Sequence, residues 1–116
     1  MSSIVAFTGD LMFSSNIEAT LRRDGHETTT VEALPALERE LTRGSVDLVI
    51  LDLHADAEAG AVVMLCQPLG VPVLAFGRHT EPALLRSARD AGCREVVPRL
   101  TFVEQMTRLV QGSIGA

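Results

Sequence analysis

Asp52 is the residue of this sequence with the clearest capacity for chemistry, because of where it stands. It follows the run 48–51, which reads Leu-Val-Ile-Leu and predicts a buried strand. In an open parallel sheet, ligands and reactive groups gather just beyond the carboxyl ends of the strands. A carboxylate at that point is therefore a candidate reactive group.

The elements that must position Asp52 alternate between strand-like runs and amphipathic helical patterns. Phe13, Ile17 and Leu21 recur every four residues and predict a helix. Thr80 and Thr101 are the expected N-caps of the last two helices. Strands are expected at 4–7, 26–31, 48–51, 72–76 and 95–97, and helices at about 12–24, 34–43, 61–66, 81–91 and 102–110.

This alternation predicts the fold class. Five strands that alternate with five helices imply right-handed crossovers and a parallel sheet covered on both faces. We expect an α/β fold, a flavodoxin-like doubly wound five-stranded parallel sheet in the order 2-1-3-4-5, with a crevice beyond the first and third strands. The 116 residues suit one domain, 1–116, in which the tail 112–116 is expected to be frayed.

The charge composition excludes several classes of protein. The formal net charge is −5, and all 10 basic residues are arginines, so no mechanism can depend on lysine. An acidic chain is poorly suited to neutralising the phosphates of nucleic acid, and without Trp or Tyr it offers few platforms on which bases could stack. We therefore expect no nucleic-acid partner.

The remaining composition predicts a cytoplasmic protein. No signal peptide is recognisable, and no apolar stretch approaches the roughly 20 residues that cross a bilayer. We expect no membrane association. Cys66 and Cys93 lack the spacing of a metal site and are expected to be reduced, largely buried thiols.

Three segments give the chain a resemblance to response-regulator receiver domains. Residues 48–53, Leu-Val-Ile-Leu-Asp-Leu, resemble the third strand of receivers, whose terminal Asp accepts a phosphoryl group. Residues 91–93, Ala-Gly-Cys, resemble the Ala-Gly-Ala before the receiver's fifth strand, and 71–73 resemble the entry to its fourth. The resemblance covers nearly the whole chain and makes Asp52 the phospho-acceptor position.

The same resemblance shows that the residues around Asp52 depart from the receiver pattern. Receivers hold Mg²⁺ with two acidic residues after the first strand, end the fourth strand with a hydroxyl residue followed by a small one, and place a lysine after the fifth. An aromatic residue of the fifth strand is replaced by Val96. The pocket implied here is formed by Thr8, Gly9, Asp10, Gly77, Arg78 and Arg99.

Asp52 and Asp10 each have a structural interpretation beside the functional one. Asp52 could be a structural carboxylate paired with Arg78 or Arg99 across the crevice, and such an Arg–carboxylate contact is expected to involve Asp52 or Asp10. Asp10 could cap the first helix, or it could bind a metal ion together with Asp52. A weaker hypothesis is a transition-metal site formed by His54, His79, Asp52, Asp56 and Glu58.

The leading functional hypothesis is a stand-alone, atypical receiver domain. It would act as a protein-interaction module in bacterial two-component-type signal transduction, without efficient phosphoryl transfer, enzyme activity or a cofactor. Its partner would be a signalling protein, such as a histidine kinase or an effector. The alternative is a phosphorylatable receiver that uses Mg²⁺ and in which a histidine kinase phosphorylates Asp52. A weaker alternative is a small-ligand or metal-binding domain that uses the strand-end crevice.

A protein-interaction module needs a docking surface, and the resemblance points to the fourth helix, fifth strand and fifth helix. This surface carries charges of both signs that could form a two-fold homodimer contact. Exposed ion pairs contribute only about 0–1 kcal/mol each, so apolar contacts from Leu84 and Val96 are expected to supply most of the affinity. The charged residues of this expected interface are Arg86, Arg89, Asp90, Arg94, Glu104 and Arg108.

Overall fold

The computed structural model describes residues 2–115 and contains five strands, five α-helices and one short 3-10 helix. The predicted elements are all present, with boundaries within a few residues of those expected. They are β1 Ser3–Phe7, α1 Leu11–Arg23, β2 Glu27–Val31, α2 Leu34–Arg43, β3 Leu48–Asp52, α3 Ala59–Cys66, η1 Gln67–Leu69, β4 Val73–Gly77, α4 Pro82–Ala91, β5 Glu95–Pro98 and α5 Arg99–Gly115.

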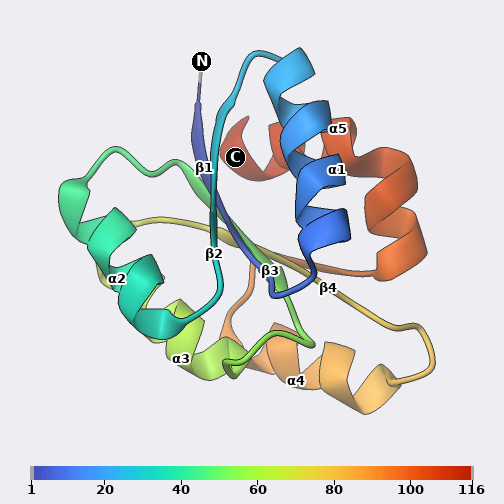
Figure 1. Cartoon of the computed structure of the whole chain (residues 1–116). Helices are drawn as coiled ribbons and strands as arrows, with labels where there is room; N and C mark the ends of the chain where they lie inside the picture. The colour runs from blue at the N-terminus through green and yellow to red at the C-terminus, as the bar shows by residue number, and fades with distance from the viewer. Residues whose placement is uncertain (1, 116) are drawn as a thin grey trace.

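The five strands form one parallel sheet in the order β2-β1-β3-β4-β5, which confirms the predicted topology. Helices α1 and α5 cover one face, and α2, α3 and α4 cover the other (Figure 1). Because every crossover is a helix, all strands point the same way. The carboxyl ends of β1, β3, β4 and β5 therefore meet at one edge of the sheet.

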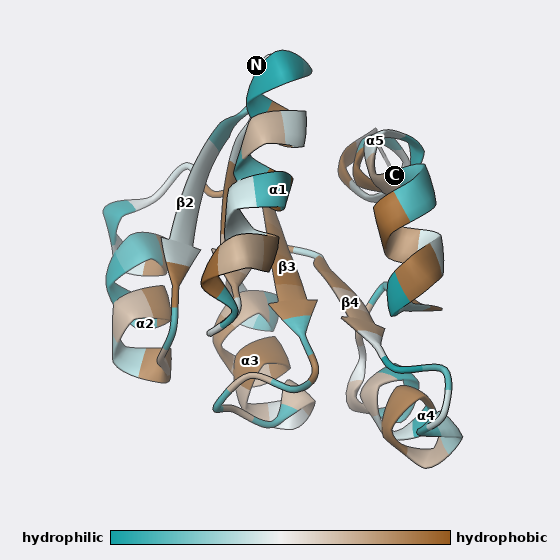
Figure 2. Ribbon diagram, turned by 45° about the vertical axis from the view of Figure 1, so that its right-hand side comes forward, coloured by the Kyte–Doolittle hydropathy of each residue, from teal (hydrophilic) through white to brown (hydrophobic). Residues whose placement is uncertain are grey.

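Alternating side chains of the strands fill a core on each face of the sheet. In β1, Ile4 and Ala6 pack with α1 and α5, whereas Val5 and Phe7 pack with α2, α3 and α4. Figure 2 shows hydrophobic colouring along β3 and β4 and hydrophilic segments on the outer sides of the helices. Burial on both faces explains why β3 reads as an unbroken apolar run.

Two predicted N-caps are wrong. The N-cap of α4 is Glu81 rather than Thr80, and it makes no side-chain capping hydrogen bond. Helix α5 begins at Arg99, directly after β5, so Thr101 lies inside the helix. Because no loop separates Pro98 from Arg99, the helix has already begun before Thr101, and Thr101 cannot be its N-cap.

Residues 112–115, where a frayed tail was expected, continue the last helix in this structure. Helix α5 bends at Gln105, where the backbone is non-helical, and then continues to Gly115. Ser113 is only 3% exposed, and its carbonyl oxygen accepts a hydrogen bond of 2.8 Å from Nη1 of Arg94. This contact ties the last turns to the start of β5. Ala116 lies outside the described residues.

Within residues 2–115, no helix combines the length and the apolar character needed to cross a membrane.

Candidate functional site

The carboxyl edge of the sheet brings Thr8 and Asp52 together at its centre. The register pairs Phe7 of β1 with Leu51 of β3, so the next residue of each strand lies side by side. Asp52 is 5% exposed and Thr8 is 1% exposed. The two strand ends therefore place a hydroxyl against a carboxylate in a site from which water is largely excluded.

Both carboxylate oxygens of Asp52 already have hydrogen-bond donors. Oγ1 of Thr8 donates to Oδ2 at 2.8 Å, and the backbone N–H of His54 donates to Oδ1 at 2.9 Å. A buried carboxylate is costly unless such donors satisfy it. Hydrogen bonds to an ionised group are stronger than neutral ones, so these two contacts hold Asp52 in place.

Asp10 caps the first helix, as one of the two interpretations expected. Its Oδ1 accepts the N–H of Phe13 at 3.0 Å, and its Oδ2 accepts Nη2 of Arg99 at 3.3 Å. The Phe13 amide first, and the Arg99 guanidinium second, hold the pKa of Asp10 below its usual value. Cζ of Arg99 also lies 4.2 Å from the centroid of the Phe13 ring, a cation–π contact.

The expected Arg–carboxylate contact is confirmed for Arg99 and Asp10, but Asp52 has no arginine partner among the described residues. Arg78 points elsewhere. Its side chain is 63% exposed and lies 3.9 Å from Glu81, while its backbone N–H donates to Nε2 of His54 at 3.2 Å. Thr8 satisfies the buried carboxylate without a second charge, so no guanidinium is needed there.

Gly77, at the position where receivers carry a hydroxyl residue, has its surroundings filled. A Cβ built on Gly77 would lie 3.2 Å from both Cδ1 of Leu53 and Cδ2 of Leu85. Both leucines are buried. A serine or threonine could enter only if these side chains moved, so the end of β4 offers no hydroxyl toward Asp52 and has no ready space for one.

The residues at this edge do not fit a magnesium site. Mg²⁺ demands near-octahedral oxygen ligands, usually including carboxylates. Both oxygens of Asp52 already accept a hydrogen bond, Asp10 is paired with a guanidinium, and Thr8 and Gly9 add no negative charge. Within residues 2–115, no three His, Cys, Asp or Glu side chains come together as metal ligands. The weaker hypothesis of a transition-metal site therefore finds no support among the described side chains of His54, His79, Asp52, Asp56 and Glu58.

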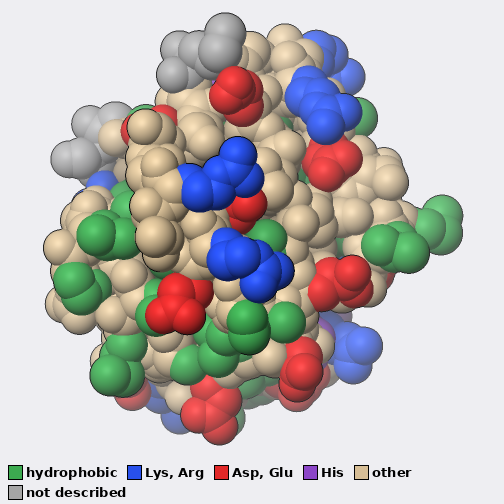
Figure 3. Space-filling model, turned by 60° about the vertical axis from the view of Figure 1, so that its left-hand side comes forward, with side chains coloured by type: hydrophobic (Ala, Val, Ile, Leu, Met, Phe, Trp, Pro, Cys, Tyr) green, Lys and Arg blue, Asp and Glu red, His purple; other side chains and the backbone are tan. Residues whose placement is uncertain are grey.

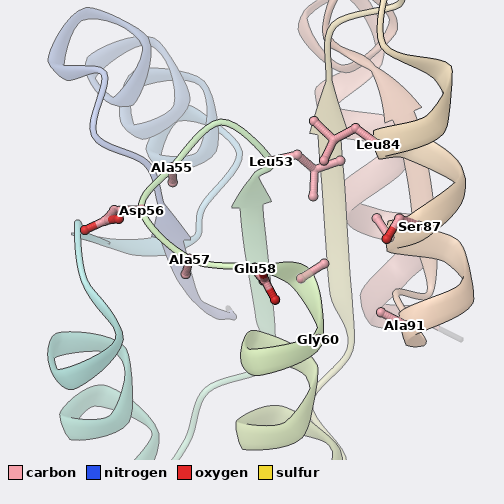
Figure 4. Close-up of a pocket in the computed structure, with 11 residues that line it drawn as sticks. Leu53, Ala55, Asp56, Ala57, Glu58, Gly60, Leu84, Ser87 and Ala91 are labelled. Atoms are coloured by element: carbon pink, nitrogen blue, oxygen red, sulfur yellow. The ribbon is translucent and has the colours of Figure 1, made fainter.

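A hollow of about 650 Å³ lies beside this edge, between helix α4 on one side and the loop 53–58 with the start of α3 on the other, and Asp52 does not line it. Figure 4 shows Leu53 facing Leu84, with Ser87 further along α4 and Asp56 pointing away on the other side of the loop. The lining residues are mostly alanines and leucines, and none of them is basic. The hollow offers nothing that would bind a phosphoryl group.

The charged residues of the expected interface are partly engaged within the domain. Arg89 donates from Nη2 to the carbonyl oxygen of Val96 at 3.2 Å, Arg94 anchors α5, and Arg108 contacts Gln105. Val96 is 5% exposed and belongs to the core, so it is not available as an apolar contact. Arg86, Asp90 and Glu104 are exposed.

Sequence reasoning missed two features of the site. The imidazole of His54 accepts the backbone N–H of Arg78 and so joins the loop after β3 to the loop after β4. The backbone N–H of His54 orients Asp52. Nothing in the sequence signals a backbone donor. The contact of Leu53 with the Gly77 position could have been anticipated, because a leucine directly after Asp52 must point to the opposite face of the sheet.

The sequence matches no protein-family model, and no curated protein matches it. Solved structures are similar over nearly the whole chain. A response-regulator receiver domain from Clostridium thermocellum superposes with a TM-score of 0.85 at 18% identity and covers 99% of this chain and 95% of its own. The receiver domain of a sensor histidine kinase from Pseudomonas aeruginosa, with magnesium coordinated in its active-site cleft, gives 0.82 at 18% identity, with coverages of 99% and 98%.

A third similar structure is the beryllofluoride-activated NtrC4 receiver domain dimer, with a TM-score of 0.86, 15% identity and coverages of 99% and 98%. At these identities the comparison establishes the fold. The chain has the flavodoxin-like fold of response-regulator receiver domains. The sequence resemblance and the structural similarity therefore agree, while the residues around Asp52 differ from those that the resemblance leads one to expect.

Proposed function

We propose that the chain is an atypical receiver domain that acts as a protein-interaction module in two-component-type signalling, without efficient phosphoryl transfer. The observation that carries the proposal is the engagement of both Asp52 oxygens by Thr8 and His54. An acceptor carboxylate must present a lone pair to the incoming phosphorus. Each Asp52 oxygen already accepts one buried, charge-assisted hydrogen bond, which makes its remaining lone pair a weaker nucleophile.

The chemistry of phosphoryl transfer supports the same proposal. Charge spreads over the phosphoryl oxygens in the transition state, and metal ions and positioned cations normally neutralise it. In this domain the nearby cation, Arg99, is paired with Asp10 and lies over Phe13. Gly77 provides no hydroxyl toward the phosphoryl oxygens. The site lacks the means to stabilise the reaction, although it keeps the carboxylate.

The contacts that replace metal and phosphate would hold the domain in one arrangement. Thr8 links the ends of β1 and β3, and Arg99 links the start of α5 to the start of α1. Regulation would then come from binding a protein partner in the cytoplasm, such as a histidine kinase or an effector, or from contact between two copies. We assign the domain no catalytic activity of its own.

The alternative function is a phosphorylatable receiver with Asp52 as acceptor. Two observations favour it: Asp52 stands at the end of β3, and a structure of the same fold is described with magnesium in its active-site cleft. It would require Asp10 to leave Arg99 before it could help to hold a metal ion beside Asp52. Small-ligand binding in the strand-end crevice is a weaker proposal, because the neighbouring hollow does not include Asp52.

Magnesium binding separates the proposal from this alternative. Titration of the wild-type domain with Mg²⁺, followed by calorimetry and by amide NMR shifts near Asp52, is expected to show no saturable binding in the low-millimolar range. The double variant Thr8→Asp with Gly9→Asp places an acidic pair after β1 and should gain binding. Wild-type binding as tight as that of the double variant would favour the phosphorylatable receiver.

A further inference from the structure

Strand β2 forms one edge of the sheet, and its outer side is unpaired. Within residues 2–115 it bonds to β1 and to no other strand, and Figure 2 shows it as the outermost strand on its side of the sheet. The backbone N–H of Glu27 donates to the carbonyl oxygen of Ser2 at 2.8 Å, and that of Thr8 donates to the carbonyl oxygen of Val31 at 3.1 Å. Since a strand bonds to one neighbour through every second residue, residues 27, 29 and 31 bond to β1.

The backbone N–H and C=O groups of Thr28 and Thr30 therefore point away from the sheet. Within the described part of the chain, neither a backbone nor a side-chain group bonds to them. Thr29, between them, is exposed, so no helix or loop covers the middle of this edge. Unpaired strand groups of this kind are a template for pairing with another strand.

The other edge of the sheet is protected, whereas β2 is not. Strand β5 ends in Pro98, which has no N–H, and the carbonyl oxygen of Val96 accepts Nη2 of Arg89 at 3.2 Å. Strand β2 reads Glu-Thr-Thr-Thr-Val, without the proline or lysine that commonly protects an edge. Threonine and valine also favour strands. The edge open to a further strand is therefore that of β2.

A hydroxyl group on β2 also lacks a partner. Oγ1 of Thr28 is buried and has no hydrogen-bond partner among the described residues. Thr30 lies on the same, α1-facing side of the strand, where its Oγ1 donates to Oε2 of Glu18 at 2.8 Å. The Thr30 hydroxyl keeps a lone pair with which it could accept a second hydroxyl. One threonine thus needs a partner, and the other can serve as one.

We propose that β2 pairs antiparallel with β2 of a second copy of this chain, around a two-fold axis between the two Thr29 residues. Thr28 of each copy would exchange backbone hydrogen bonds with Thr30 of the other, so the outward N–H and C=O groups would all be satisfied. Rotation of the Thr28 side chain would bring its hydroxyl to Thr30 of the other copy, a cross-strand threonine pair. This inference rests on the proposed interaction function and names the surface through which two copies meet.

The charges beside β2 allow this contact. In the antiparallel register Glu27 lies opposite Val31 of the other copy, so the two Glu27 residues stand roughly 13 Å apart along the strands. On α1, Glu18 lies 3.9 Å from Arg22, so this helix contributes charges of both signs. Figure 3 shows the side of the molecule on which α2 lies in Figure 1, and the acidic and basic side chains on it are interspersed. The face in that view carries no block of one charge that would keep two copies apart.

A second copy fits this edge better than a free peptide does. Its β2 is already ordered by β1, whereas a peptide would lose conformational entropy in exchange for bonds to only two residues. The edge also suits self-association better than the expected interface on α4, β5 and α5. There, Arg89 and Arg94 are engaged within the domain, and Val96 is buried.

Self-association of the full chain is the first test. Because a contact of this size is weak, sedimentation equilibrium at chain concentrations up to about 1 mM should show both monomers and dimers. Thr29→Lys places two like charges at the two-fold axis and should weaken the dimer at least about tenfold. Thr80→Lys is the matched control, since it adds the same charge at an exposed threonine after β4 and should leave the dimer unchanged. Circular dichroism checks that both variants are folded.

Cross-linking tests the register. Two Thr29 residues that face each other would have Cα atoms about 4.5 Å apart, within the range that a disulfide spans. Thr29→Cys should therefore form a covalent dimer on mild oxidation, whereas Glu27→Cys, with its counterpart roughly 13 Å away, should not. The wild-type chain reports any background from Cys66 and Cys93. Equal cross-linking of the two variants would overturn the proposed register.

Amide hydrogen exchange tests which groups are covered. At high chain concentration the amides of Thr28 and Thr30 should exchange more slowly than in dilute solution, while the amide of Thr29, which already bonds to β1, should not change. Two results would overturn the proposal outright. One is a chain that stays monomeric at the highest concentration, and the other is a dimer that Thr29→Lys leaves intact but Arg89→Glu with Arg108→Glu abolishes.

This test is separable from that of the proposed function. A dimer through β2 in a chain whose Asp52 is phosphorylated would refute only the proposed lack of phosphoryl transfer. A monomeric chain with an inert Asp52 would refute only the β2 contact.

Discussion

The hydrogen bond from Thr8 to Asp52 can be removed with almost no change in side-chain shape by the substitution Thr8→Val. Oγ1 of Thr8 is buried and donates to Oδ2 of Asp52 at 2.8 Å. It also accepts the backbone N–H of Asp10 at 3.2 Å. A valine would place a methyl group against the carboxylate oxygen and leave that oxygen without its protein donor.

The expected loss of stability follows from the burial of this contact. Hydrogen bonds to charged groups contribute about 1.5–3 kcal/mol, and a buried acceptor left without a donor adds a desolvation penalty. We expect Thr8→Val to lower the free energy of unfolding by about 2 kcal/mol. Thr8→Ser keeps the hydroxyl and removes one methyl group, so it should cost only about 1 kcal/mol.

Urea denaturation followed by circular dichroism measures these differences. Thr29→Val, an exposed threonine on β2, is the matched control and should change stability by no more than about 0.5 kcal/mol. The order of the two Thr8 variants is decisive, because packing alone would make Thr8→Ser the more damaging change. If Thr8→Ser proves less stable than Thr8→Val, the hydrogen bond does not stabilise the site as we argue.

Other predictions concern the end of β4, the helix cap and the thiols. Gly77→Ala should destabilise the domain by about 1–3 kcal/mol because its Cβ meets two leucine methyl groups, whereas Gly60→Ala, in open space within α3, should stabilise it by about 0.5–1 kcal/mol in the same denaturation assay. Since folding lowers the pKa of Asp10, its charged form stabilises the native state above the unfolded pKa of about 4, and this contribution is lost as the pH falls through the folded pKa. The stability gap between wild type and Asp10→Asn should therefore close in acid, and a constant gap down to low pH would contradict the capping role. Burial raises the pKa of the Cys66 and Cys93 thiols to about 11, so both should react slowly with thiol reagents at neutral pH until the protein unfolds.

The sheet could be predicted from the sequence because its signals are strong and mutually consistent. The unbroken apolar run at β3 reflects burial of that strand on both faces of the sheet. The four-residue spacing of Phe13 and Ile17 reflects burial of one face of helix α1. The glycine after α4, Gly92, has a φ of 110°, a conformation that residues with a side chain rarely adopt. Such positions mark helix ends reliably.

The contacts of the site were less predictable, because the sequence does not show which of several possible donors bonds to the buried carboxylate of Asp52. The sequence shows a carboxylate and several arginines, and charge pairing is the obvious expectation. The structure instead gives Asp52 a hydroxyl and a backbone amide, which satisfy it at lower desolvation cost than a guanidinium would. The exposure of Leu100 and Val103 was also hidden, since an apolar residue near the start of a helix does not show by itself which way its side chain faces.

The central claim is that Asp52 is not an efficient phospho-acceptor, and intact mass spectrometry tests it most directly. The full chain is incubated with Mg²⁺ and a small phosphodonor such as acetyl phosphate, beside the Asp52→Asn variant and a receiver domain known to be phosphorylated under the same conditions. We predict that this chain keeps its unmodified mass while the known receiver gains a phosphoryl group. A single added phosphoryl mass that is absent from Asp52→Asn would contradict the account and establish the phosphorylatable receiver in its place.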